Sequence, residues 1–154
     1  MPTETRNQEE KREALTEYVR MYYEHQYDRM AKLEEQRLTI TNVVITLSIV
    51  AFTFGFSNIQ TLTAIVGIGL PFVMVVSNVF AIIYVVRSAD FIRTHQKRAK
   101  RILELYAQEL FELDKSNQWP HRLLARWKIQ VLIHGLLILA ALFPAVVYLF
   151  TVIK

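Results

Sequence analysis

Strongly polar side chains lie inside stretches of sequence that contain no charged residue, and three of them are candidate functional residues. Asn42 lies in Leu38–Phe56, Asn78 in Leu62–Val86 and His134 in Ile129–Ile153. Amide and imidazole groups in so apolar a setting need hydrogen-bond partners or water. Two interpretations follow. The three side chains line a pore or a small binding site, or they join neighbouring helices by hydrogen bonds, which is a common use in membrane helices.

A candidate hinge lies in the second stretch, in the segment Val66-Gly67-Ile68-Gly69-Leu70-Pro71. Glycine lets helices approach closely, and proline removes a backbone hydrogen bond and bends a helix. Gly67, Gly69 and Pro71 are therefore predicted to form a hinge. The alternative is a kink that only improves packing.

A basic cluster follows the second stretch and consists of Arg93, Lys97, Arg98, Lys100 and Arg101. Such a cluster next to a membrane attracts anionic lipid headgroups, and a simple solvated surface is the alternative. No aromatic side chains alternate with these residues to stack on bases, so nucleic acid is not an expected partner.

Little in the sequence favours catalysis. Arg20 and His25 have the Arg-x4-His spacing of one family of ribonucleases. In an unbroken helix, however, five residues leave the two side chains about 140° apart. The apolar stretches have no Asp, Glu, Lys or Arg for proton relay or coupling. Since the chain also has no cysteine and no metal-ligand spacing, we expect neither an enzyme nor a bound metal or cofactor.

The three apolar stretches are each long enough to cross a bilayer, because a helix rises about 1.5 Å per residue and the hydrocarbon core is about 30 Å thick. Of the 18 Lys and Arg residues, all but Lys154 lie in residues 1–37 and 87–128. Basic residues beside membrane helices stay in the cytoplasm. The sequence predicts a multi-pass protein of the plasma or inner membrane, with its N-terminus in the cytoplasm and its C-terminus outside.

Amphipathic extensions adjoin the first two apolar stretches. Leu15–Leu33 gathers Leu, Val, Met and Tyr residues on one side of a helix, and Phe91–Leu113 continues the second stretch with a similar apolar stripe. We expect the two to pair as an antiparallel, coiled-coil-like stalk. The predicted fold is an all-α integral membrane protein with three transmembrane helices and long amphipathic cytoplasmic extensions. Its divisions are 1–37, 38–86, 87–128 and 129–154.

This order of elements resembles the small two-transmembrane effector proteins of bacterial antiphage defence, the SLATT-type and related families. The resemblance rests on Tyr18–His25 before the hairpin and on Phe91–Leu113 after it. It covers about residues 10–113, is architectural without a diagnostic motif, and the third apolar stretch departs from the two-span pattern. It implies membrane disruption or pore formation after phage sensing.

Three classes of function remain. The first is a homo-oligomeric pore or membrane-perturbing effector, whose partners are the lipid bilayer and further copies of itself. The second is a scaffold or accessory subunit of a larger membrane complex, with a cytoplasmic protein docked on the helical extensions. The third, a small transporter or membrane enzyme, is disfavoured by the uncharged spans.

Overall fold

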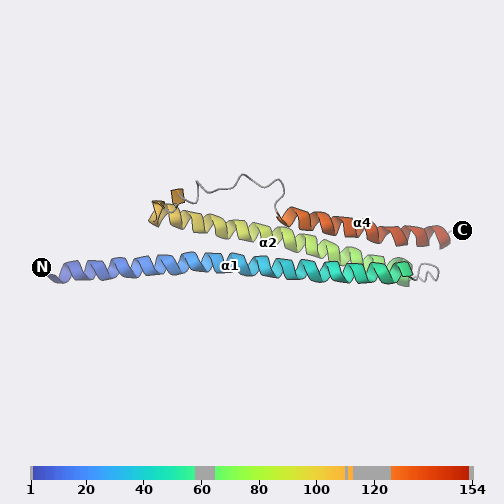
Figure 1. Ribbon diagram of the computed structural model, residues 1–154, viewed down its shortest axis with the longest axis horizontal. Coiled ribbons are helices and arrows are strands. Elements are labelled where there is room, and N and C mark those ends of the chain that lie inside the picture. Colours follow the sequence, from blue (N-terminus) through green and yellow to red (C-terminus); the bar gives the residue numbers. More distant parts are fainter. Residues whose placement is uncertain (1, 58–64, 110, 113–125, 153–154) are drawn as a thin grey trace. The chain divides into compact units, whose positions relative to one another are not determined.

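The computed structural model describes residues 2–57, 65–109, 111–112 and 126–152 (Figure 1). These form helix α1 (Pro2–Ser57), the π-helical segment η2 (Ile65–Gly69), helix α2 (Leu70–Tyr106) and helix α4 (Arg126–Val152). The described part of the chain contains no strand. Residues 58–64, which precede η2, and residues 113–125, which precede α4, lie outside the described residues.

Three helices are long and apolar enough to cross a membrane, which confirms the prediction at that level. They comprise Leu15–Ser57, Val66–Tyr106 and Arg126–Phe150. In α1 no glycine or proline occurs between Pro2 and Gly55, so nothing interrupts the helix where its polar half meets its apolar half. An all-helical, multi-pass arrangement is compatible with these three elements.

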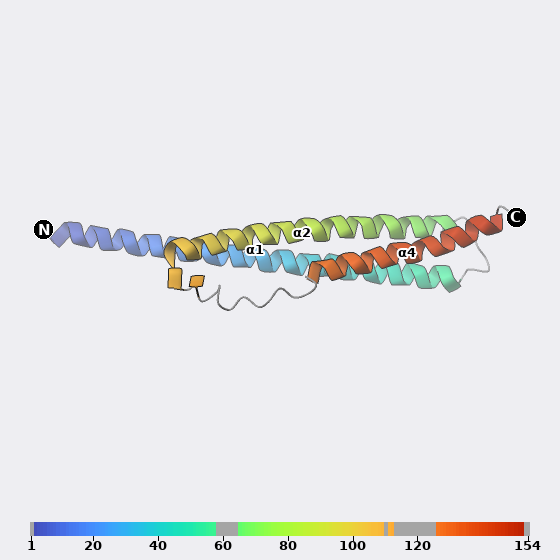
Figure 2. The same cartoon turned by 90° about the horizontal axis from the view of Figure 1, so that it is seen from above.

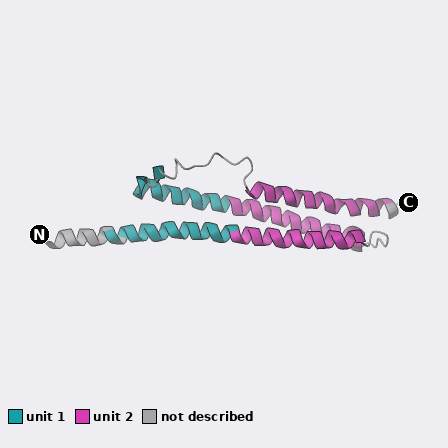
Figure 3. Cartoon of the chain, viewed as in Figure 1, with its two compact units in different colours: residues 1–34, 90–120 teal, residues 35–89, 121–154 magenta. Residues whose placement is uncertain are grey.

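The chain forms two compact units, each built from separate parts of the sequence (Figure 3). Unit 1 contains residues 1–34 and 90–120, and unit 2 contains residues 35–89 and 121–154. Helices α1 and α2 each contribute to both units. The basic and amphipathic extensions thus belong to unit 1, and the apolar stretches belong to unit 2.

Unit 2 is a bundle of three helices. The C-terminal part of α1, the N-terminal part of α2 and the whole of α4 lie side by side in both views of the cartoon (Figures 1 and 2). Asn78 contacts Ser48, whereas Leu70 approaches Gly55, so α1 and α2 run antiparallel. We call the end of this bundle that carries Arg37, Arg87 and Lys128 the basic end. The opposite end, with Ser57 and η2, is the hairpin end.

Unit 1 joins the remaining parts of α1 and α2 through a partly buried polar contact. The Nδ1 atom of His95 lies 2.7 Å from Oε1 of Gln26, which is itself buried. The predicted helical stripe reached Leu113, but α2 ends at Tyr106. The interruption at Ala107 is local, because its N–H still donates to the carbonyl of Leu103 and the N–H of Phe111 donates to the carbonyl of Ala107.

Candidate functional site

The core of unit 2 holds a hydrogen-bonded polar cluster that we call the Asn78 cluster: Ser48 from α1, Asn78 from α2 and His134 from α4. The Nδ2 atom of Asn78 donates to Oγ of Ser48 over 2.7 Å and to the carbonyl of Met74 over 2.8 Å. The Oδ1 atom of Asn78 lies 2.7 Å from Nδ1 of His134. Asn78 and His134 are both fully buried at 0% exposure, so three helices meet at one amide.

The contacts of the Asn78 cluster determine which nitrogen of His134 carries a proton. The Met74 carbonyl can only accept, so the Asn78 atom facing it must be the NH2 group. The Oδ1 atom of Asn78 therefore faces His134, and the imidazole must donate from Nδ1. Neutral His134 is then the Nδ1–H tautomer, and its Nε2 atom bears a lone pair.

Further buried polar groups lie between the Asn78 cluster and the basic end. On α1, Arg37 and Thr41 share one helical face with Ser48, and on α4 Gln130 precedes His134 by one turn. Arg37, Thr41 and Gln130 are all buried. Small side chains of α2, Ala81 and Val85, lie on the same section of the core.

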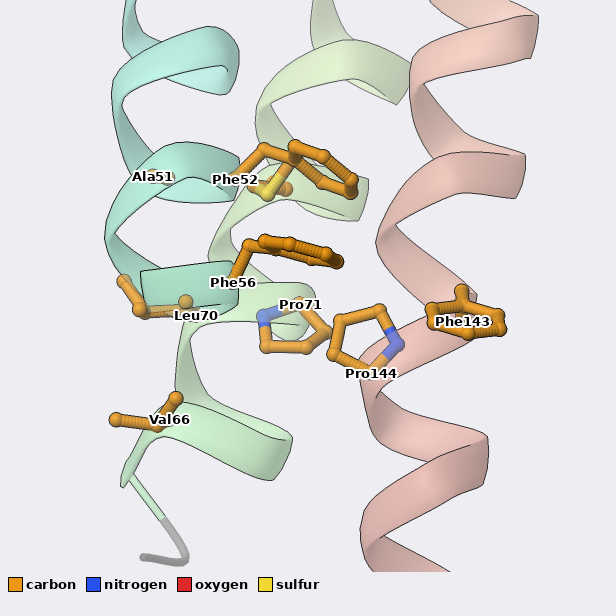
Figure 4. Close-up of a pocket in the computed structure, with 10 residues that line it drawn as sticks. Ala51, Phe52, Phe56, Val66, Leu70, Pro71, Phe143 and Pro144 are labelled. Atoms are coloured by element: carbon orange, nitrogen blue, oxygen red, sulfur yellow. The ribbon is translucent and has the colours of Figure 1, made fainter. Parts of the chain in front are cut away.

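The hairpin end of the core is apolar. A small pocket there is lined by residues of α1, η2, α2 and α4, and the aromatic rings of Phe52 and Phe56 and the rings of Pro71 and Pro144 border it (Figure 4). Its lining residues are Ala51, Phe52, Gly55, Phe56, Val66, Leu70, Pro71, Met74, Phe143 and Pro144. Polar and apolar groups are therefore separated along the axis of the bundle, with the Asn78 cluster between them.

The candidate hinge residues lie at this apolar end. Gly67 and Gly69 belong to η2, and Pro71 is the second residue of α2, which follows η2 directly. A Cβ added to Gly67 would overlap the side chain of Tyr148 on α4, whereas one added to Gly69 would meet nothing within 4 Å. Gly67 thus permits a close approach of η2 and α4. Bending at this segment stays a prediction.

Asn42 is separated from the two other predicted polar residues. It is exposed on α1, on the side opposite to Thr41 and Ser48, and makes no hydrogen bond within the described ranges. Four hydroxyl residues share this side of α1, and with Asn42 they form what we call the outer stripe: Thr39, Asn42, Thr46, Thr53 and Ser57. Thr53 and Ser57 donate to carbonyls of their own helix, at 2.9 Å each.

The basic cluster lies in unit 1 with all five side chains exposed: Arg93, Lys97, Arg98, Lys100 and Arg101. Arg93 lies 3.6 Å from the carboxylate of Asp90. Contact of this cluster with lipid headgroups stays a prediction. Arg20, one of the two residues of the ribonuclease-like spacing, donates to Glu17 over 2.8 Å on an unbroken part of α1.

Sequence reasoning missed several buried polar residues: Gln26, Arg37, Thr41, Ser48 and Gln130. A usable signal was present on α1, because Arg37, Thr41, Val44 and Ser48 recur at helical spacing on one face. Gln26 lies inside the apolar stripe of the first extension and its burial with His95 was not foreseen.

Part of the apolar stripe predicted over Leu15–Leu33 is exposed in the structure. Leu15, Tyr18 and Tyr22 are exposed by 53%, 68% and 42%, although they share a side of α1 with the buried Gln26. The apolar side of this extension is therefore only partly covered within unit 1.

Unit 2 thus provides hydrogen-bonding groups at the Asn78 cluster and an apolar pocket at the hairpin end. Among the described residues, no group of three or more His, Cys, Asp or Glu side chains is placed to hold a metal ion. No family model, curated protein or solved structure matches this chain.

Proposed function

We propose that this chain is a homo-oligomeric membrane protein that forms a pore or perturbs the bilayer. In this proposal the three apolar helices cross the membrane with the basic end of unit 2 in the cytoplasm. Copies pack around an axis with the outer stripe of α1 facing inward. The single observation that carries the proposal is the exposure of Asn42 on the side of α1 that faces away from its own bundle.

The argument rests on the cost of an amide in lipid. A carboxamide exposed to hydrocarbon has neither water nor protein to bind, which is unfavourable. Contact with Asn42 of a second copy supplies a donor and an acceptor at once, and such interhelical bonds contribute about 0.6–2 kcal/mol each. The hydroxyls of Thr39 and Thr46, one turn to either side, extend the polar surface along α1.

A path lined by the outer stripe would contain amide and hydroxyl groups and no charge. Selectivity filters discriminate ions by rings of charged side chains or by arrays of backbone carbonyls. The proposed path therefore has weak ion selectivity. Closure then depends on an apolar constriction that excludes water, since the exposed neighbours of the stripe, including Val43 and Val50, are apolar.

The test compares Asn42→Leu with Val73→Leu, a change at an exposed apolar position of α2 outside the outer stripe. Particle mass in mild detergent and dye leakage from liposomes are measured for both. The wild type and Val73→Leu are expected to form an oligomer and to leak dye, whereas Asn42→Leu shifts towards the monomer and leaks less with insertion unchanged. A wild-type particle that stays monomeric in detergents and nanodiscs, without leakage or conductance, contradicts the proposal.

A second candidate function is a scaffold or accessory subunit that docks another protein. The uncovered Leu15, Tyr18 and Tyr22 favour it, because exposed apolar patches of this kind mark interaction sites. Replacing Tyr18 and Tyr22 by Ser should release a co-purifying partner if this function applies. If the same variant instead lowers the mass of a homo-oligomer, the patch belongs to self-assembly.

The setting that we propose is antiphage defence at the bacterial inner membrane, on the architectural resemblance described above. Expression of the chain should then depolarise cells after phage infection, and Asn42→Leu should reduce that effect. If infected cells survive equally well with and without the wild-type chain, the proposed role in antiphage defence is contradicted. The membrane function is then tested by the leakage assay alone.

A further inference from the structure

Several buried polar atoms in unit 2 have no hydrogen-bond partner within the ranges that the structure describes, and three of them lie on side chains without a fixed charge. These three are Oγ1 of Thr41, Oε1 of Gln130 and Nε2 of His134. Their residues are exposed by only 3%, 8% and 0%. A buried polar group without a partner costs about 1–3 kcal/mol, so three such groups in one small bundle call for a common explanation.

These atoms belong to successive levels of the core. Gln130 precedes His134 by one turn of α4, about 6 Å along the helix, and Thr41 precedes Ser48 by two turns of α1, about 10 Å. Ser48 and His134 both contact the amide of Asn78, so these two residues lie at the same height along the bundle. Thr41 and Gln130 therefore both lie between the Asn78 cluster and the basic end.

The three atoms cannot all be satisfied by hydrogen bonds to one another. The amide oxygen of Gln130 can only accept, and Nε2 of His134 is an acceptor because Nδ1 carries the proton. The one proton available among the three belongs to the hydroxyl of Thr41, which can serve only one acceptor. At least one donor from outside these three groups is required. The buried guanidinium of Arg37 carries donors one turn before Thr41. Water, which brings two donors, is the smallest molecule that can reach the acceptors further along the core.

We propose that the core of unit 2 between the basic end and the Asn78 cluster binds internal water, with Nε2 of His134 as the innermost atom that this water reaches. The inference rests on the proposed crossing of the membrane but not on the oligomer. Water enters from the proposed cytoplasmic side, past the buried Arg37. Buried waters commonly bind polar groups that the protein leaves unpaired.

The apolar half of the core ends this hydrated section. Beyond the Asn78 cluster the core contains Met74, Val66 and Ala141, which are buried and offer water no side-chain partner. Apolar cavities of this kind stay dry. In each chain, water would therefore extend from the basic end as far as the Asn78 cluster and no further. The buried imidazole of His134 would then exchange with water from one side of the membrane only.

The test is water-edited nuclear magnetic resonance of the full chain in lipid bilayers. Magnetisation from water should reach the side-chain NH2 of Gln130 and the ring of His134 much faster than it reaches Ala141 and Met74. The nitrogen shifts of His134 should identify a proton on Nδ1 and a hydrogen-bonded lone pair on Nε2. Equal build-up at all four residues, or a His134 ring with its only proton on Nε2, would overturn the proposal.

Two matched variants on α1 separate hydration from general loosening of the bundle. Thr41→Val removes the buried hydroxyl, and Thr46→Val makes the same change on the exposed side. Thr41→Val should slow water transfer to His134 without raising the denaturant midpoint, whereas Thr46→Val should leave transfer unchanged. A rise in the midpoint for Thr41→Val would mean that its hydroxyl was dry and unpaired, and would overturn the proposal.

The same samples distinguish this inference from the oligomer. In nanodiscs that hold a single chain, water transfer to His134 should persist, because the proposed water site lies within one bundle. A chain that stays monomeric in mild detergent and does not leak dye, but has a hydrated His134, would contradict the pore alone. If the oligomer leaks dye but no water reaches His134, the pore proposal stands and the internal water site is contradicted.

Discussion

The side chain of Tyr148 on α4 occupies the space that a Cβ atom at Gly67 would need. Gly67 is buried in η2, whereas Gly69, two residues on, has no neighbour within 4 Å of such an atom. The two glycines of one short motif therefore have different roles. Gly67 permits the contact between η2 and α4, and Gly69 is not needed for it.

Gly67→Ala should destabilise unit 2, and Gly69→Ala should not. Overpacking a tight contact costs about 1–3 kcal/mol, because the Tyr148 ring or the η2 backbone must shift. Chemical unfolding in mild detergent measures both variants against the wild type. Equal unfolding midpoints for the two variants would show that Tyr148 moves aside without cost. The double variant Gly67→Ala, Tyr148→Ala should recover part of the loss.

Asn78→Leu should also lower stability, although leucine is the more apolar residue. The substitution leaves Oγ of Ser48 and the Nδ1–H group of His134 without their present partner in the core. Each orphaned group costs about 1–3 kcal/mol. Asn42→Leu is the control, since in a single chain it removes an exposed amide that makes no hydrogen bond among the described residues. An Asn78→Leu midpoint at or above that of the wild type would contradict the importance of the cluster.

The sequence predicted the three long apolar helices because charge-free runs of that length are unambiguous. It did not predict which polar residue of each run faces inward. Helix faces are assigned from the contrast between polar and apolar positions, and in an apolar span nearly every face is apolar. Asn42 and Asn78 are therefore equivalent in the sequence, yet one is exposed and the other is fully buried.

Two further features depend on contacts rather than on local pattern. The π-helical turn over Ile65–Gly69 brings Gly67 against Tyr148, a residue far along the chain that no local periodicity identifies. Gln26 interrupts an apolar stripe, so its burial becomes understandable only with His95 opposite. In both cases the missing information was the identity of the neighbouring helix at that level.

Reporter fusions should place the two ends of the bundle on opposite sides of the membrane. Lys and Arg residues lie at the basic end, and basic flanks of membrane helices stay in the cytoplasm. Fusions at Ser57 and at Lys154 should both report the outer side, and a fusion at the N-terminus should report the cytoplasm. A cytoplasmic signal at Lys154 would mean that the third apolar stretch does not cross.

Unit 1 should lose stability as the pH falls below about 6.5, because of His95. Partial burial lowers the pKa of His95 from its ordinary value of 6.5, and the positive charges of Arg98, Arg29 and His25 lower it further. The unfolded chain therefore takes up a proton at a higher pH than the folded chain does. The contribution of His95 is complete above pH 6.5 and is lost progressively as the pH falls towards the folded pKa.

The pH dependence can be measured from unfolding midpoints between about pH 5 and pH 8, which bracket the ordinary pKa of histidine. His95→Gln should flatten the curve in this window, because glutamine does not titrate and keeps a donor for Oε1 of Gln26. Gln96→Ala, at an exposed position next in the chain, should keep the wild-type slope. A wild-type midpoint that rises as the pH falls would reverse the sign of the argument, since it requires His95 to bind its proton more tightly in the folded state.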